Sequence, residues 1–202
     1  MRKRIKRGLR VSRFILYKET LIDFREHVWA FIGSFAAIAC IALCNHLSGG
    51  IQDYVFLIGS FGASSVLVYG AIQSPLAQPR NLVGGHVLSA LIGVSVCKLL
   101  PETLWLAAPL AVSLSIVGMQ MSRTMHPPGG ATALIAVAGP EKIKSLGYLY
   151  VLSPVLSGVL ILLIFALVFN NLTRHRSYPT SKKFTRTLRK IRVYTKRRKQ
   201  AA

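Results

Sequence analysis

The sequence is short of acidic side chains: six Asp or Glu stand against 26 Lys or Arg in 202 residues, a formal net charge of +20. Between residues 28 and 171 charge of either sign is scarce, while about nine basic residues lie in 1–25 and about twelve in 174–202. Together with a hydrophobic content of 52%, this pattern is typical of a polytopic membrane protein with basic tails. The six acids fall in tails and loops, which disfavours a cation-coupling core built on carboxylates inside the membrane.

The sequence also lacks the residue patterns of common enzyme and metal sites. Its three cysteines lie in apolar runs without a CxxC spacing, its five histidines show no HxxxH spacing, and no serine sits in a GxSxG elbow. We therefore expect no cofactor, no metal and no enzymatic activity. A membrane-embedded enzyme is the least favoured of our three hypotheses about function, because the sequence shows no catalytic group.

The two basic blocks flank apolar segments and carry no nucleic-acid recognition motif. We interpret them as cytoplasmic anchors attracted to anionic lipid headgroups, and we expect no nucleic-acid partner. The block at the C-terminal end is interpreted either as a surface helix or as a disordered basic tail.

Six apolar segments can be marked, at roughly 28–47, 54–72, 84–100, 104–122, 127–139 and 149–171. Five are long enough, or nearly so, to cross ~30 Å of hydrocarbon as helices, but thirteen residues in the fifth cover only about 20 Å. Because both tails are basic, the positive-inside rule places both in the cytoplasm and requires an even number of crossings. We interpret the fifth segment as a broken crossing, an extended stretch followed by a half-helix. Four crossings with two dips would satisfy the same rule, and Lys142 and Lys144 in a presumed outer loop count against our topology.

The expected fold is therefore an all-α polytopic membrane protein with about six membrane elements, some of them broken or half helices. Its expected organisation is a basic cytoplasmic segment at 1–27, a transmembrane domain at 28–172 and a basic cytoplasmic tail at 173–202.

Two segments of the sequence echo one another at an offset of 68 residues. "GASSVLVYG" at 62–70 and "GATALIAVAG" at 130–139 both begin Gly-Ala-hydroxyl and continue into aliphatic residues. Two three-element repeats, inverted in the membrane, would explain the echo, and this arrangement recurs among transporters. Small-residue patterns of packed helices explain it equally well. The repeat predicts that Gly62 and Gly130 begin equivalent elements that enter from opposite sides.

The stretch "TMHPPGGATAL", starting at Thr124, suggests an anion site. Pro127 and Pro128 impose an extended approach to a helix whose first amides would be unpaired, and a positive helix terminus with bare amides suits a small anion. A proline kink packed by glycine fits "PPGG" about as well. Pro79 precedes a similar group, "RNLVGGH", in which Arg80, like Arg123, is either a cytoplasmic anchor or an attractor of anions. The candidate substrate-binding residues are Gly62, Ala63, Ser64, Ser65, Arg80, Asn81, His86, Arg123, His126, Gly129, Gly130, Ala131 and Thr132.

These motifs resemble those of the HPP family of integral membrane proteins, named for His-Pro-Pro. The resemblance rests on "GSFGASSVLVYGA", "SPLAQPRNLVGGHVLSALIG" and "LAVSLSIVGMQMSRTMHPPGGATAL", and it covers roughly 29–168. Members are described as small multi-spanning proteins, usually with four predicted transmembrane helices. A plant chloroplast member is associated with nitrite transport, and bacterial members are regarded as transporters.

The resemblance implies a transporter or channel for a small monovalent anion, nitrite first. We expect the protein in a bacterial inner membrane, with both termini cytoplasmic by the positive-inside rule. A membrane core of this size also leads us to expect a homo-oligomer. The alternative is a non-transporting scaffold or sensor whose basic tails bind lipid or a partner.

Overall fold

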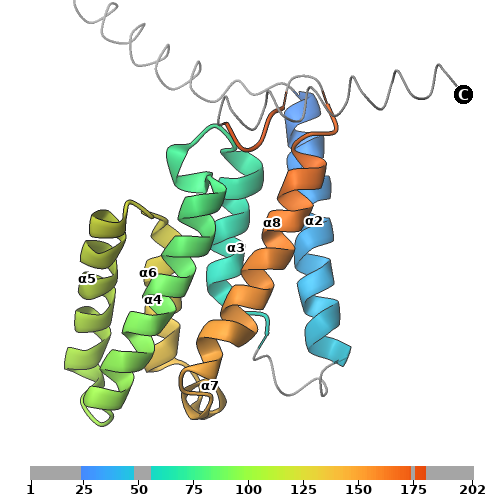
Figure 1. Cartoon of the computed structure of the whole chain (residues 1–202). Coiled ribbons are helices and arrows are strands. Elements are labelled where there is room, and N and C mark those ends of the chain that lie inside the picture. Colours follow the sequence, from blue (N-terminus) through green and yellow to red (C-terminus); the bar gives the residue numbers. More distant parts are fainter. Residues whose placement is uncertain (1–23, 48–55, 174–175, 181–202) are drawn as a thin grey trace, which may run out of the picture.

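The computed structural model describes residues 24–47, 56–173 and 176–180, and in this part the chain is a bundle of helices (Figure 1). The elements are α2 (Phe24–Leu47), α3 (Gly59–Ser65), η1 (Val66–Gly70), η2 (Pro75–Ala77), α4 (Pro79–Leu99), α5 (Leu104–Ser122), α6 (Pro127–Ala138), α7 (Glu141–Ser145), η3 (Val151–Leu156) and α8 (Ser157–Phe169). Helix η1 continues α3, and α8 continues η3. The expected all-α membrane protein is confirmed.

Four helices are long and apolar enough to cross a membrane: α2, α4, α5 and η3–α8, which is kinked at Ser153. The other two membrane elements are short, since α6 has 12 residues and α3–η1 is made of 7 plus 5. The described elements therefore include both the six segments expected from the sequence and the four long helices that the family resemblance implied.

The six membrane elements alternate in direction (Figure 1). Helices α2, α4 and α6 run away from the face that carries residues 24 and 180, and α3–η1, α5 and η3–α8 run back towards it. Each half of the bundle thus has a long, a short and a long element, and the second half is inverted relative to the first. The first long helix of each half packs on the last long helix of the other, α2 on α8 and α5 on α4.

The internal offset of 68 residues matches the helix starts. Gly59 begins α3 and Pro127, 68 positions later, begins α6. The residue before each start, Ile58 or His126, has extended backbone. The predicted start points are wrong by one helical turn, because Gly62 and Gly130 both lie inside these helices.

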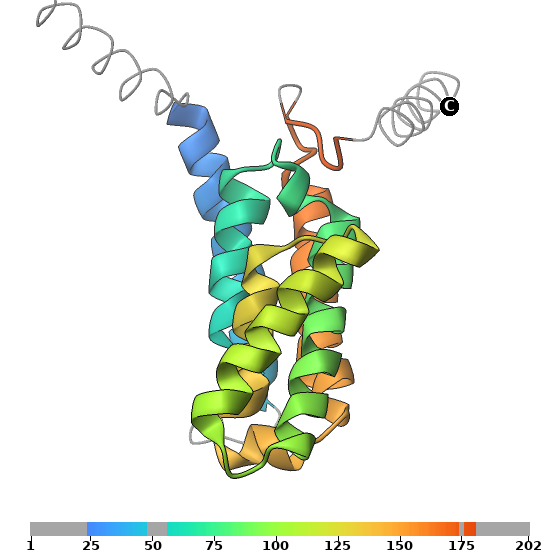
Figure 2. The same cartoon turned by 90° about the vertical axis from the view of Figure 1, so that its left-hand side faces the viewer.

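The extended stretch before α6 is confirmed. Helix α5 ends at Ser122, Arg123 takes a left-handed conformation with φ 56°, and the chain then runs extended to His126 (Figure 2). Helix α4 begins at Pro79, five residues before the apolar segment expected at 84–100. Pro79 does not interrupt it but forms its first turn, where the missing N–H costs nothing, so Arg80, Asn81 and His86 are all helical.

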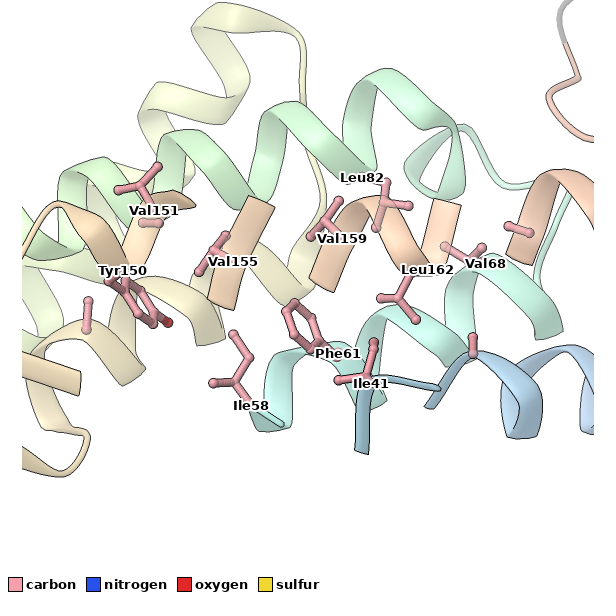
Figure 3. Packing of buried hydrophobic residues seen from close by; sticks show 14 of the residues in the cluster. Ile41, Ile58, Phe61, Val68, Leu82, Tyr150, Val151, Val155, Val159 and Leu162 are labelled. Carbon is pink, nitrogen blue, oxygen red and sulfur yellow. The ribbon is translucent and has the colours of Figure 1, made fainter. Parts of the chain in front are cut away.

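The larger hydrophobic core lies between η3–α8, α3–η1 and α2 (Figure 3). Phe61 of α3 is fully buried against α8, where a side chain on Gly158 would overlap its ring. Val155, Val159 and Leu162 continue this contact along the helix. A smaller core of Val96, Ala107, Ala111, Ala133 and Val137 joins α4, α5 and α6.

Residues 176–180 pack into the bundle, beyond the domain boundary expected at 172. Arg176 and Tyr178 are buried, and the Tyr178 hydroxyl donates to the carbonyl of Ala77 at 2.7 Å. Burial raises the pKa of Tyr178 above its ordinary value. Most of the basic segments predicted at 1–27 and 173–202, namely residues 1–23 and 181–202, lie outside the described residues, and so do the roles predicted for them.

Candidate functional site

Four polar side chains meet where the two short helices pass one another. Ser64 comes from α3, His86 from α4, His126 from the turn before α6 and Thr132 from α6, and all four are fully buried. Ser64 Oγ lies 2.7 Å from Nε2 of His86 and 3.0 Å from Nε2 of His126, and Nδ1 of His86 lies 2.6 Å from Oγ1 of Thr132. We call these four residues the histidine cluster. It joins four of the residues that the sequence motifs selected.

The ring of His86 is held at both nitrogens by positions that correspond in the two repeats. Ser64 and Thr132 are 68 residues apart and occupy the sixth position of α3 and α6, respectively. Their hydroxyls contact the two different nitrogens of the imidazole, Ser64 at Nε2 and Thr132 at Nδ1. The inverted repeat therefore builds the cluster as well as the fold.

The glycine pair before His86 makes room for the extended stretch. A Cβ on Gly84 would lie 2.6 Å from the side chain of Thr124, and one on Gly85 would lie 2.6 Å from Cβ of His126. Gly129 is equally close to α4, with Gly85 O at 2.9 Å from its would-be Cβ. These contacts bring the backbone of residues 124–129 directly against α4 and position His126 beside His86, with ring centroids 5.0 Å apart.

His126 is fixed by a hydrogen bond on its far side. Its Nδ1 lies 2.8 Å from the carbonyl oxygen of Leu76, in the turn η2. A carbonyl only accepts, so Nδ1 carries the proton, and Nε2 of the neutral ring presents a lone pair to Ser64.

Arg80 and Asn81 lie outside the cluster and hold the broken backbone instead. Arg80 donates to the carbonyl of Ser122 at 2.8 Å, and Asn81 donates to that of Met125 at 2.7 Å. Both carbonyls lie where the helical hydrogen-bond pattern stops, so each side chain supplies a donor that the helix does not provide. Arg123 is exposed at the end of α5. The structure thus places both arginines at one end of the bundle, apart from the two histidines.

Three further candidates from α3 point elsewhere. Gly62 and Ala63 are exposed, and Ser65 donates to the carbonyl of Phe61 within its own helix. Gly62 and Ser65 line a hollow of about 680 Å³ between α2 and α3–η1, whose other walls are mainly apolar. Its exposed rims, such as Phe31 and Val66, suit contact with lipid.

The start of α6 offers fewer free amides than the sequence suggested. Pro127 and Pro128 have no N–H, and the amide of Gly129 donates to the carbonyl of His126 at 2.8 Å. Gly130 and Ala131 are half-buried on the next turn. The polar groups at this helix start are therefore side chains, His126 and Thr132, rather than bare backbone donors.

The sequence did not point to two residues beside the cluster. The Tyr150 hydroxyl donates to the backbone carbonyl of Thr132 at 3.1 Å. Ser89 lies one turn after His86, and Ser60 lies one turn before Ser64. Both hydroxyls are fully buried and have no hydrogen-bond partner among the described residues. Helical spacing from His86 would have singled out Ser89, whereas Tyr150 approaches only through the tertiary fold.

The cluster combines two imidazoles with hydroxyl groups and is closed off from both ends of the bundle. Across the described ranges, no three His, Cys, Asp or Glu side chains gather as metal ligands. Such a set of neutral donors and acceptors can bind a small polar solute or carry protons, because imidazole both donates and accepts.

Comparison with known proteins agrees with the fold. The family described as "HPP, transmembrane region" matches residues 19–179. Two curated transmembrane proteins of Dictyostelium discoideum are 46% and 47% identical over 160 residues, which is 78% of this chain and 51% and 56% of theirs. The chain thus spans about half the length of these relatives, which are eukaryotic and do not point to a bacterial membrane. No solved structure matches the chain. On the family match, the chain belongs to the HPP family of integral membrane proteins.

Proposed function

We propose that this protein is a carrier for a small monovalent anion such as nitrite, and that the anion binds beside the histidine cluster. The observation that carries the proposal is the burial of Ser64, His86, His126 and Thr132 between two short antiparallel helices. Polar groups inside a membrane are costly and tend to mark the path of a solute.

The unpaired hydroxyls of Ser60 and Ser89 supply the donors that an anion requires. Each lies on the same helix face as a member of the cluster, one turn from Ser64 or from His86. A buried hydroxyl without a partner is unfavourable, so a ligand that accepts its hydrogen bond gains affinity. The carboxylates of the described residues lie elsewhere: Glu26 pairs with Arg176, Glu141 pairs with Lys144, and Glu102 is exposed in a turn.

The closed cluster favours a carrier over an open channel. All four side chains are shut off from solvent, so access requires the helices to rearrange. Inverted repeats provide such a rearrangement, because exchanging the conformations of the two halves opens the site to the other side.

The Ser64–His86 distance of 2.7 Å also resembles the nucleophile and base of a hydrolase. A hydrolase would need donors for an oxyanion next to the serine. Ser64 lies inside α3, where the neighbouring amides are used by the helix, and its hydroxyl already contacts a second histidine. This environment suits binding better than acyl transfer.

The test is nitrite uptake by proteoliposomes that contain the purified chain. We expect uptake above that of protein-free vesicles, and we expect His86→Gln to lower it about ten- to a hundredfold by removing hydrogen bonds at the cluster. The matched control is His46→Gln, at the exposed end of α2, which should transport like the wild type. Uptake equal to that of empty vesicles, or full uptake by folded His86→Gln, would contradict the proposal.

A second measurement tests binding alone. Nitrite should raise the thermal midpoint of the detergent-solubilised wild type, because a ligand that binds the native state stabilises it. The shift should vanish in His86→Gln and remain in His46→Gln.

A further inference from the structure

The protons of the histidine cluster can be assigned bond by bond. Nδ1 of His126 must donate to Leu76, so its Nε2 accepts from the hydroxyl of Ser64; the Ser60 carbonyl, 3.0 Å from the same Ser64 oxygen, is the other acceptor within reach of that hydroxyl. Ser64 in turn accepts from Nε2–H of His86, whose Nδ1 accepts from the hydroxyl of Thr132. In this neutral state each ring nitrogen that carries a proton faces an acceptor, and each ring nitrogen without a proton faces a donor. The hydrogen bonds run from donor to acceptor in one series, from the Thr132 hydroxyl to the carbonyl of Leu76.

One extra proton fits without the movement of any heavy atom. With that proton on Nδ1, His86 donates to both Ser64 and Thr132, and the Thr132 hydroxyl turns to the carbonyl of Pro128, 3.3 Å away. Ser64 still donates to His126. All donors again have acceptors, so the cluster has a complete hydrogen-bond pattern in the neutral and in the singly protonated state.

Ser64 connects the two imidazoles as a relay. If the N–H of His86 breaks and its proton joins the oxygen of Ser64, the original hydroxyl proton of Ser64 forms a new N–H bond at Nε2 of His126. The positive charge has then moved from one ring to the other, and the number of O–H and N–H bonds is unchanged. A second added proton would place two cations with ring centroids 5.0 Å apart, which their repulsion opposes.

We propose that His86 and His126, linked by the hydroxyl of Ser64, bind a single proton and that this proton crosses the membrane together with the anion. The inference rests on the proposed function and adds its co-substrate.

The surroundings of the pair leave the proton without a resident counter-charge. Helix α3 contributes Ser64 and the ring of Phe61, and helix α6 contributes Thr132. Tyr150, directly before η3, contributes its phenol, which donates to a backbone carbonyl. From α5, the Met119 sulfur lies beside Gly85 and Gly129. None of these groups is anionic.

The charged groups at the helix ends lie outside the histidine cluster. Arg80 of α4 donates to the carbonyl of Ser122, and Arg123 is exposed at the end of α5. In the described part of the chain, the carboxylates of Glu26 and Glu141 pair with basic side chains.

The missing counter-charge explains why proton and anion would move together. A buried imidazolium is unfavourable on its own, and so is a buried anion, but each offsets the charge of the other. Binding of one therefore strengthens binding of the other, and the loaded site is neutral. The structure then predicts electroneutral transport with one proton per anion.

The experiment measures protons and nitrite in the same vesicles. Proteoliposomes of the full chain carry an internal pH-sensitive dye, nitrite is added outside, and the signal of protein-free vesicles is subtracted to remove leakage of nitrous acid. We expect internal acidification with one proton per nitrite, at a rate that does not change when the membrane potential is clamped. Ser64→Ala should lower both fluxes about ten- to a hundredfold, since it keeps both histidines but removes the relay. Ser64→Thr should retain them, and Ser95→Ala, which removes an exposed hydroxyl of α4, should match the wild type.

The outcomes separate the two proposals. Nitrite uptake by the wild type without acidification, or uptake that carries net charge, overturns the proton site and leaves anion transport standing. Undiminished proton flux in folded Ser64→Ala overturns the relay. No uptake above protein-free vesicles overturns both. If Ser64→Ala does not fold, the proton-to-nitrite ratio of the wild type still decides.

Discussion

Arg176 and Glu26 form an ion pair of 2.9 Å although 150 residues separate them in the sequence. The same guanidinium donates to the carbonyl of Tyr69 at 2.8 Å and to the side chain of Asn170 at 2.9 Å. Burial lowers the pKa of Arg176 from its ordinary value, and Glu26 acts in the opposite direction. One side chain thus joins the start of α2, the end of η1 and the end of α8.

We predict that Arg176→Met lowers the thermal midpoint of the purified protein by about 4–24 °C. The substitution leaves the acceptors of Tyr69 and Asn170 unpaired, at ~1–3 kcal/mol each, and 1 kcal/mol corresponds to about 2–4 °C for a chain of this length. Arg80→Met is the control, because Arg80 is exposed and water can replace its bond to Ser122. Equal midpoints for the two variants would show that the buried pair contributes nothing.

Thr132→Val tests the hydrogen bond to Nδ1 of His86. Valine keeps the shape of threonine but removes the hydroxyl, so we expect a loss of ~1–3 kcal/mol in the free energy of unfolding. Thr103→Val should be neutral or stabilising, because the Thr103 hydroxyl is buried without a partner in the described structure. Chemical denaturation in detergent measures both. A Thr132→Val protein as stable as the wild type would count against the bond.

Gly93→Ala should disrupt the contact between α4 and α6. A Cβ at this position would lie 2.7 Å from the carbonyl oxygen of Ala133 and 2.8 Å from its Cα, which are backbone atoms held within α6. We expect a loss of ~1–3 kcal/mol or no folded protein. Gly130→Ala is the matched control on the facing helix, since its nearest atom, in Val112, is 3.9 Å away. Size-exclusion profiles and thermal midpoints distinguish the two, and a fully stable Gly93→Ala would contradict the packing.

Cysteine labelling tests the course of the chain through the membrane. In a background without Cys40, Cys44 and Cys97, Arg80→Cys and Glu102→Cys lie at opposite ends of α4, and both positions are exposed. An impermeant thiol reagent should therefore reach them from opposite sides of the vesicle membrane. We predict that Arg80→Cys is labelled from the cytoplasmic side. Labelling of both from one side would exclude α4 as a crossing.

Hydrophobic segments and the internal echo predicted the membrane elements, because each depends on local composition and length. The similarity between the two segments predicted helix starts three residues after the observed ones. The matching letters begin at Gly62 and Gly130, whereas the preceding turns, Gly-Ser-Phe and Pro-Pro-Gly, differ in chemistry and share only their backbone path. Two segments that share only their backbone path cannot be matched from their residue types.

The candidate site was predicted in part. Ser64, His86, His126 and Thr132 were selected through three separate motifs, but nothing local indicated that they meet in one place. Arg80 was interpreted as an anchor or an attractor of anions, and its observed partner is the carbonyl of Ser122. That partner depends on how α4 and α5 approach one another, which a single sequence does not contain.

The two ends of the described bundle emerge on the same face, beside the turn η2 (Figure 1). A soluble module joined before residue 24 or after residue 180 would therefore sample a single aqueous compartment. The turn η2 on this face supplies the Leu76 carbonyl that anchors His126. The matched region covers 51% and 56% of the two Dictyostelium relatives, which therefore carry additional sequence outside it.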